Sequence, residues 1–340
     1  MRSPSFYQRL LDDVSRSFAL CIPRLDPPFR DQVSLAYLLL RVLDTVEDAP
    51  FTDRRLHQLQ FDRLRGFLLA MPAEADLAAF VAAFPPELVE RERRLLSHTN
   101  ALLEDVHGLP AAVREAIFRA TDRMAEGMAA YTRRGSQLHL IDVEDVARYA
   151  CFVAGLVAEM LTELWALANP EPPPSLVHAY HFGLFLQKVN ILKDQCEDEA
   201  EGRFLVPDRA ELLASLGDDA HGALEYLKAL PSRDRGYRTF CAWCVMMGAA
   251  TVATLDEPKR SRRSATAALL AHTAAIVDDN AALVRQFSEL MPALPVLARR
   301  APLAKPESVE WFREALVSPL GDAELERLGV LRLEVATSSR

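Results

Sequence analysis

Two apolar segments of helical length, each ending in a short acidic stretch, constrain the fold of this chain more than any other feature. Residues 34–48 end in Asp44-Thr45-Val46-Glu47-Asp48, and residues 182–198 end in Asp194-Gln195-Cys196-Glu197-Asp198. Aspartates at positions i and i+4 lie on one face of a helix. Because both segments are apolar nearly all round, we expect two buried helices whose acidic ends form one site.

The polar residues of these segments fall on one side of each predicted helix. At about 100° per residue, an arc of roughly 60° in the first segment holds Tyr37, Arg41, Asp44 and Asp48. In the second segment an arc of roughly 80° holds Gln187, Asn190, Asp194 and Asp198. A narrow polar stripe on a buried helix faces a polar cavity or a salt-bridge partner. One acidic stretch would be ordinary helix surface, but two copies with in-register polar residues favour a functional site.

The spacing of these carboxylates suits Mg²⁺. This ion prefers octahedral oxygen ligands and usually takes one or two carboxylates together with waters and substrate phosphate oxygens. Carboxylates from two facing helices can hold two or three such ions against a diphosphate and neutralise its charge as it leaves. Arg41 and Lys193, beside the aspartates, either contact phosphate oxygens directly or form ion pairs within their own helices.

Composition predicts an all-α protein, with a single large helical domain over residues 1–300 and a C-terminal tail, 301–340, that is partly helical or frayed. Only 13 glycines occur among 340 residues, and no run of alternating β-branched residues is bounded by hairpin turns. Prolines separate segments long enough for helices of several turns. We expect these helices near residues 5–20, 29–48, 53–70, 87–106, 111–134, 143–168, 175–200, 219–229, 233–255 and 264–290.

Charge and cysteine content limit the cellular compartment and the classes of binding partner that we expect. The formal net charge of −9 argues against a nucleic-acid partner, which would need a basic face. Five cysteines without the spacing of a disulfide framework indicate reduced thiols and a cytoplasmic protein. Asp12 and Asp13 stand where a signal peptide would be apolar. We also expect no membrane-spanning helix, because residues 241–255 are too few and residues 149–168 include two glutamates.

Several elements, in order along the chain, resemble the squalene and phytoene synthase family, and the squalene branch in particular. The elements are Ser15-Arg16-Ser17-Phe18, the first acidic helix from Tyr37 to Asp48, a tyrosine helix from Tyr149 to Val157, the second acidic segment from Leu184 to Pro207, and Phe240-Cys241-Ala242. The similarity runs from about residue 5 to residue 290. This ordered set is far more specific than either acidic stretch alone.

The resemblance implies an isoprenoid synthase fold around a central cavity and a head-to-head condensation of two farnesyl diphosphates. The first product would be presqualene diphosphate, a cyclopropyl intermediate, which NADPH-dependent rearrangement would convert to squalene. Alternatives are an enzyme that stops at presqualene diphosphate or makes dehydrosqualene or phytoene, and a non-catalytic helical lipid-binding protein. Buried carboxylates are costly without a metal, which disfavours the last. We expect a monomer, and peripheral membrane contact for release of the hydrocarbon is left open.

The resemblance also implies roles for individual residues. Mg²⁺ would be held by Asp44, Asp48, Asp194 and Asp198, with Glu47 and Glu197 as outer or alternate ligands. Diphosphate would be bound by Arg16, Arg41, Lys193 and Arg203. Other substrate-binding positions would be Phe18, Tyr37, Val153, Ala154, Val157, Ala158, Gln187 and Asn190.

Five positions need separate comment. Tyr149 matches the family tyrosine assigned to proton removal or diphosphate contact. The resemblance thus implies five catalytic residues, Tyr149 and the four aspartates. From the sequence alone, however, an aromatic residue at the start of a helix is more often part of the core. Lys193 stands where the squalene branch usually has arginine, and Ala158 stands where the family usually has glycine. NADPH would be bound by Arg260 and Arg262, but their basic run also fits a solvated or membrane-surface turn.

Overall fold

The computed structural model of the chain describes residues 1–15, 17–135, 138–255 and 263–292. Three residues to which binding roles are assigned from the sequence, Arg16, Arg260 and Arg262, lie outside these ranges, as does the whole tail after residue 300. The predicted domain boundary at residue 300 therefore stays a prediction.

The described part of the chain is helical throughout, and its only bridge of the β type joins His139 to Phe204. The elements are α1 (Pro4–Val14), α2 (Phe18–Cys21), the 3₁₀ turn η1 (Ile22–Arg24), α3 (Phe29–Asp48), α4 (Arg54–Leu69), α5 (Glu74–Ala82), α6 (Glu90–Ser97), α7 (Thr99–His107), α8 (Ala111–Arg133), α9 (Val143–Ala150), the π-helical turn η2 (Cys151–Gly155), α10 (Leu156–Ala168), α11 (Leu176–Ala200), α12 (Arg209–Ala229), α13 (Arg235–Val252), α14 (Arg263–Ile276) and α15 (Asn280–Leu290). The predicted all-α class is confirmed.

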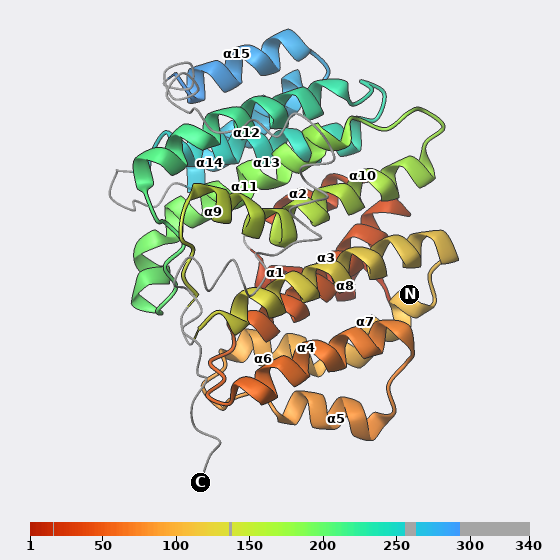
Figure 1. Cartoon of the computed structure of the whole chain (residues 1–340). Helices are drawn as coiled ribbons and strands as arrows, with labels where there is room; N and C mark the ends of the chain where they lie inside the picture. The colour runs from red at the N-terminus through yellow and green to blue at the C-terminus, as the bar shows by residue number, and fades with distance from the viewer. Residues whose placement is uncertain (16, 136–137, 256–262, 293–340) are drawn as a thin grey trace.

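Helices α3, α8, α10 and α11 form the middle of the molecule (Figure 1). Helix α8 packs on α3 and α10, while α11 packs on α10, α12 and α13. In Figure 1, α4 to α7 lie on one side of this middle layer and α12 to α15 on the other. Helix α3 and the N-terminal part of α11 are thus held inside the fold, whereas Lys193, Cys196 and Glu197 near the end of α11 are exposed.

Helix α3 is formed and ended by its own sequence. Its apolar residues Leu35, Leu38, Leu39 and Leu43 are all fully buried, so the helix is packed on most sides. It ends at Asp48 because Ala49 adopts an extended conformation before Pro50, where proline disfavours a helical residue. The last turn of α3 therefore carries the first acidic stretch.

The predicted helix boundaries differ from the structure at several points. The helix predicted over 5–20 breaks because Ser15 is extended, and the one over 264–290 breaks at Asp279, whose side chain caps α15 by accepting from two backbone N–H groups. The helix predicted over 87–106 divides into α6 and α7 at His98. Helix α5 was not expected, and α12 begins ten residues earlier than predicted, at a cap formed by Asp208.

The segment Val143–Ala168, which comprises α9, η2 and α10, is long and apolar enough to cross a membrane by length and composition. Its most apolar 18-residue window has a mean hydropathy of 1.6, and 61% of that window is buried inside the structure. Its two glutamates, Glu159 and Glu163, pair with Arg123 and Arg119 of α8. A buried core helix passes the same test, so the finding is weak support for a span.

Candidate active site

The middle helices enclose a cavity of about 560 Å³, polar at one end and apolar along the rest. We call the polar end the acidic mouth and define it by Arg41, Asp44, Glu47, Asp48, Tyr149, Lys193, Asp194 and Arg203, all of which line the cavity. The apolar part is lined by residues that include Val33, Leu40, Met124, Met128, Val153, Ala154, Val157, Ala158, Leu161, Phe182, Leu186, Phe240 and Met247. The cavity could therefore bind one molecule that has an anionic group at one end and a hydrocarbon chain along the rest.

The last turn of α3 supplies the first half of the acidic mouth. A guanidinium nitrogen of Arg41 lies 2.8 Å from Asp44 Oδ2. Burial, and next the charge of Asp48, raise the pKa of Asp44 to about 6 even though Arg41 lowers it. Burial also raises the pKa of Glu47 well above its usual value, and the carboxylates of Asp48 and Asp44 raise it further. The mouth also has four carboxylates, Asp44, Glu47, Asp48 and Asp194, against three cations, Arg41, Lys193 and Arg203.

Helix α11 supplies the second half. Lys193 Nζ lies 3.0 Å from Asp194 Oδ2, and Asn190 and Gln187 line the cavity one and two turns before Asp194. Asp198 does not line the cavity but is buried beside it. Both acidic stretches stand at helix C-termini, where the backbone dipoles are also negative, so cations are favoured there.

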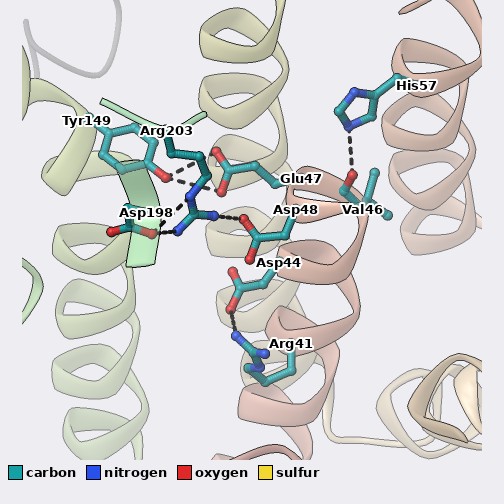
Figure 2. A network of polar contacts seen from close by, with 9 residues as sticks. All are labelled: Arg41, Asp44, Val46, Glu47, Asp48, His57, Tyr149, Asp198 and Arg203. Atoms are coloured by element: carbon teal, nitrogen blue, oxygen red, sulfur yellow. Dashed lines mark hydrogen bonds and ion pairs between the residues drawn. The ribbon is translucent and has the colours of Figure 1, made fainter. Parts of the chain in front are cut away.

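Arg203 joins the two halves (Figure 2). Its Nη2 donates to Asp198 Oδ1 at 2.7 Å, and its Nη1 donates to Asp48 of the facing helix. The loop that carries it is fixed by two backbone hydrogen bonds, Leu140 N–H to Phe204 O and Phe204 N–H to Leu138 O. Gly202 permits the loop because its φ of 82° lies in the left-handed region.

Tyr149 lies where the acidic mouth meets the apolar wall. Its hydroxyl donates to Glu47 and lies 3.2 Å from each of the two carboxylate oxygens (Figure 2). Burial, and next the charge of Glu47, raise the pKa of Tyr149 well above 10. The hydroxyl is therefore protonated at neutral pH and acts as a hydrogen-bond donor.

Small residues bring η2 and α11 into backbone contact just beyond Tyr149. A Cβ at Gly183 would lie 2.4 Å from the carbonyl oxygen of Ala154, and one at Gly155 would lie 2.6 Å from the ring of Tyr180. Single π-helical turns of this kind often occur at functional sites. Ala154 and Ala158, beside this close approach, line the cavity.

Most of the residues singled out from the sequence meet at this cavity, including Phe18, Tyr37 and all those predicted on η2 and α10. Glu197 is exposed and is not part of the cavity lining, so its role as an alternate ligand stays a prediction.

Apart from Phe18, Tyr37 and the residues of η2 and α10, the apolar lining was not predicted from the sequence, and two pairs of its residues are examples. Met124 and Met128 of α8 are spaced by one helical turn, as are Phe240 and Cys244 of α13. The helical spacing was visible, but it is the same spacing that ordinary core residues show. A further contact also went unnoticed: His57 Nε2 donates to the carbonyl of Val46 at 2.7 Å and ties α4 to the end of α3 (Figure 2).

The donor set fits Mg²⁺ bound together with a diphosphate better than a metal held by protein alone. Among the residues that the structure describes, no three acidic, histidine or cysteine side chains converge closely enough to hold a metal ion. Mg²⁺ needs only one or two carboxylates when phosphate oxygens complete its shell. Arg41 Nε is buried and has no hydrogen-bond partner within the described structure, so an anionic oxygen at the mouth would satisfy it.

Comparison with known proteins shows which fold and which family this chain shares. The helical fold, the central cavity and the facing acidic helices define the isoprenoid synthase fold, and a solved structure of TcSQS in complex with the ligand BPH1237 matches with a TM-score of 0.71 and 26% identity over 92% of this chain and 96% of that one. Residues 11–217 match the profile of the family described as Squalene/phytoene synthase. The chain therefore belongs to the squalene/phytoene synthase family.

Two curated relatives are fungal squalene synthases. That of Eremothecium gossypii is 33% identical over 279 residues, which are 72% of this chain and 60% of the relative. That of Saccharomyces cerevisiae is 37% identical over 206 residues, 58% of this chain and 44% of the relative. The chain thus matches about half the length of these relatives.

Proposed function

We propose that this protein condenses two farnesyl diphosphates head to head into presqualene diphosphate and then reduces this intermediate with NADPH to squalene. One observation carries the proposal: a mouth of paired carboxylates and cations opens directly onto an apolar cavity of about 560 Å³, with Tyr149 at the junction. Membership of the family and likeness to squalene synthases support the same reaction.

The acidic mouth binds the diphosphate end of the substrate. Asp44, Asp48, Asp194 and Asp198 are the residues that would hold Mg²⁺, which supplies positive charge to the departing diphosphate. Arg41, Lys193 and Arg203 then exchange part of their pairing with these carboxylates for phosphate oxygens. Lys193 does this as a point charge, without the two-pronged geometry of an arginine.

Tyr149 serves the step that closes the cyclopropane ring. In the preceding step diphosphate leaves with the electrons of its C–O bond, and the double bond of the second substrate forms the first carbon–carbon bond. Ring closure then forms a second carbon–carbon bond from the electrons of a C–H bond, and the proton of that C–H bond is removed. Because the Tyr149 hydroxyl is protonated and donates to Glu47, it can pass its proton to that carboxylate while it takes one from the substrate. A second role for the same hydroxyl is to donate a hydrogen bond to the leaving diphosphate.

The proposed reduction by NADPH rests on the resemblance to the squalene branch of the family, and so does the proposed location in the cell. Arg260 and Arg262 are proposed to hold the NADPH phosphates, and both lie outside the described residues. We further propose a cytoplasmic monomer that contacts a membrane peripherally, because a C30 hydrocarbon product must leave into lipid.

The test is to incubate the purified protein with farnesyl diphosphate and Mg²⁺, with and without NADPH, and to identify extracted and dephosphorylated products by mass spectrometry. Squalene formed only with NADPH is the expected result, and chelation of Mg²⁺ should abolish it. Presqualene diphosphate or dehydrosqualene regardless of NADPH would restrict the function to the condensation. Product from geranylgeranyl diphosphate instead would point to phytoene synthesis, and no product from either substrate would favour the lipid-binding alternative.

A further inference from the structure

A second buried polar cluster lies behind Tyr149, outside the cavity. It consists of Tyr131 and Arg134 at the end of α8 and Asp145 in the first turn of α9. All three residues are more than nine-tenths buried, and none lines the cavity. A buried arginine and aspartate are costly to desolvate, so their presence in an apolar core calls for an explanation.

The contacts within the cluster fix all three side chains. Arg134 Nη1 donates to Asp145 Oδ2 at 2.6 Å, and the Tyr131 hydroxyl donates to Asp145 Oδ1 at 3.0 Å. The guanidinium carbon of Arg134 stands 3.8 Å from the centre of the Tyr131 ring. The backbone N–H of Ile141 also donates to Asp145 Oδ2, at 3.2 Å, so both carboxylate oxygens are occupied.

The cluster reaches Tyr149 by two routes. Asp145 precedes Tyr149 by four residues on α9, which is one helical turn. The Tyr131 ring meets the Tyr149 ring edge to face, with the centroids 5.1 Å apart and the planes at 70°. The first route sets the position of the helix, and the second sets the orientation of the Tyr149 ring. On the opposite side, Glu47 takes the hydrogen bond of the Tyr149 hydroxyl.

We propose that Tyr131, Arg134 and Asp145 are positioning residues that hold the Tyr149 hydroxyl in its place between Glu47 and the substrate. This inference rests on the proposed function, since it gives Tyr149 a part in ring closure. An apolar cluster would fill the same space, but the ring of Tyr131 could then rotate and slide. Anchoring its hydroxyl to a buried ion pair removes that freedom, and misplacement of a reacting group by about 1 Å can cost on the order of 100-fold in rate.

The sharpest test is Tyr131→Phe, which removes one hydroxyl and keeps the ring and the ion pair. Tyr7→Phe is a matched control, because the buried Tyr7 hydroxyl donates to the buried carboxylate of Asp105 at 2.8 Å, Arg2 pairs with that carboxylate, and none of these residues lines the cavity. With Mg²⁺ and farnesyl diphosphate, we expect Tyr131→Phe to lower kcat for presqualene diphosphate about tenfold, with KM changed by less than about twofold. Tyr7→Phe should leave both constants near wild type.

A second readout does not depend on how much of the protein is folded. If Tyr149 is misplaced, diphosphate can leave without ring closure, and water then captures the allylic cation as a free C15 alcohol. The ratio of this alcohol, measured without phosphatase treatment, to presqualene diphosphate should rise in Tyr131→Phe and stay constant in Tyr7→Phe. Asp145→Asn should raise the same ratio further.

A double-mutant cycle decides whether the cluster acts through Tyr149. In a Tyr149→Phe background, Tyr131→Phe should lower kcat much less than it does in wild type, because the group that it positions is gone. Equal losses in both backgrounds, or a Tyr131→Phe enzyme that behaves like Tyr7→Phe, would overturn the inference while the wild type still makes product. A wild type that makes no product would instead overturn the proposed function and this inference with it.

Discussion

Each aspartate of the acidic mouth faces a cation: Asp44 pairs with Arg41, Asp194 with Lys193, and Asp48 with Arg203. Ion pairs of this kind would stabilise the folded state if folding lowered the pKa of the carboxylate and raised the pKa of its cationic partner. Yet burial and a neighbouring carboxylate raise the pKa of Asp44 to about 6, so its charge is only partly compensated. A carboxylate held in this state is suited to an added cation, which would complete the compensation.

Asp44→Asn should therefore separate activity from stability. We expect at least about a 100-fold loss of turnover, because one carboxylate that would hold Mg²⁺ is removed. The melting temperature should stay close to that of the wild type, since a buried and poorly compensated charge is removed as well. Asp122→Asn is the matched control, because Asp122 pairs with Arg65 at 2.6 Å on the outer side of α8 and does not line the cavity. Near-normal turnover in Asp44→Asn would remove Asp44 from the metal assignment.

The elements around Tyr149 depend on a close approach of α8 to η2. A Cβ at Gly127 of α8 would lie 2.1 Å from the ring of the buried Phe152 in η2, a distance that only movement of one element could relieve. Gly127→Ala should thus lower the free energy of unfolding by about 1–3 kcal/mol, the usual cost of overpacking. It should also reduce turnover, because η2 follows Tyr149 directly.

Gly66→Ala is the control for this prediction. Gly66 lies inside α4, and a Cβ there would meet nothing within 4 Å. The same substitution should raise the free energy of unfolding by up to about 1 kcal/mol, because alanine favours the helix and loses less entropy on folding. Chemical denaturation of both variants measures the difference, and a Gly127→Ala protein as stable as wild type would show that α8 and η2 can separate without cost.

The same elements show what the sequence could and could not predict. The limits of α3 were predicted correctly because an apolar run lies between Pro28 and Pro50, and helical register then placed Arg41, Asp44 and Asp48 on one side. At the break at Ser15, the Ser15 hydroxyl accepts a hydrogen bond from the backbone N–H of Phe18 at 3.0 Å, but serine also occurs inside helices, so the sequence alone did not single out this break. Helical spacing shows which residues are buried but not whether a buried face meets a cavity or a neighbouring helix.

The cluster of Tyr131, Arg134 and Asp145 could not be predicted from the sequence for a related reason. Its members come from two helices joined by a loop whose course sets their distances, and nothing in the spacing indicates that their side chains meet. Tyr149 was identified only by resemblance, since an aromatic residue at the start of a helix is ordinary core. The hydrogen bond of its hydroxyl to Glu47, on a helix about 100 residues away, is a purely tertiary contact.

At the scale of the whole described fold, buried carboxylates in the acidic mouth and in the scaffold can respond oppositely to pH. In the acidic mouth, burial raises the pKa of Asp44 and Glu47. In the scaffold, Asp219 is also fully buried, but Lys188 at 2.6 Å and His181 at 2.8 Å lower its pKa below the usual value. The scaffold carboxylate thus stabilises the fold when ionised, whereas those of the mouth destabilise it when ionised.

This division predicts how two substitutions change the pH dependence of unfolding in Mg²⁺-free buffer. Folded Asp44 takes up its proton near pH 6, above the value of 3.8 for an unfolded chain, so lowering the pH from 7.5 to 4.5 favours the folded state. The stability of wild type relative to Asp44→Asn should therefore rise over this range by roughly 2 kcal/mol. Asp219 has the opposite sign: its contribution is present above pH 3.8 and is lost as the pH falls through its lower folded pKa.

The advantage of wild type over Asp219→Asn should thus hold from pH 7.5 to about 5 and shrink below about 4. Denaturant unfolding of the three proteins at matched pH values measures both differences, and titrating groups remote from the two substituted sites cancel in the comparison. A wild type that gains nothing over Asp44→Asn on acidification would mean that Asp44 is already well compensated by Arg41 in the absence of metal. The acidic mouth would then bind Mg²⁺ only by displacing its own arginine, and raising the Mg²⁺ concentration would stabilise the wild type much less than the mass action of a preformed site requires.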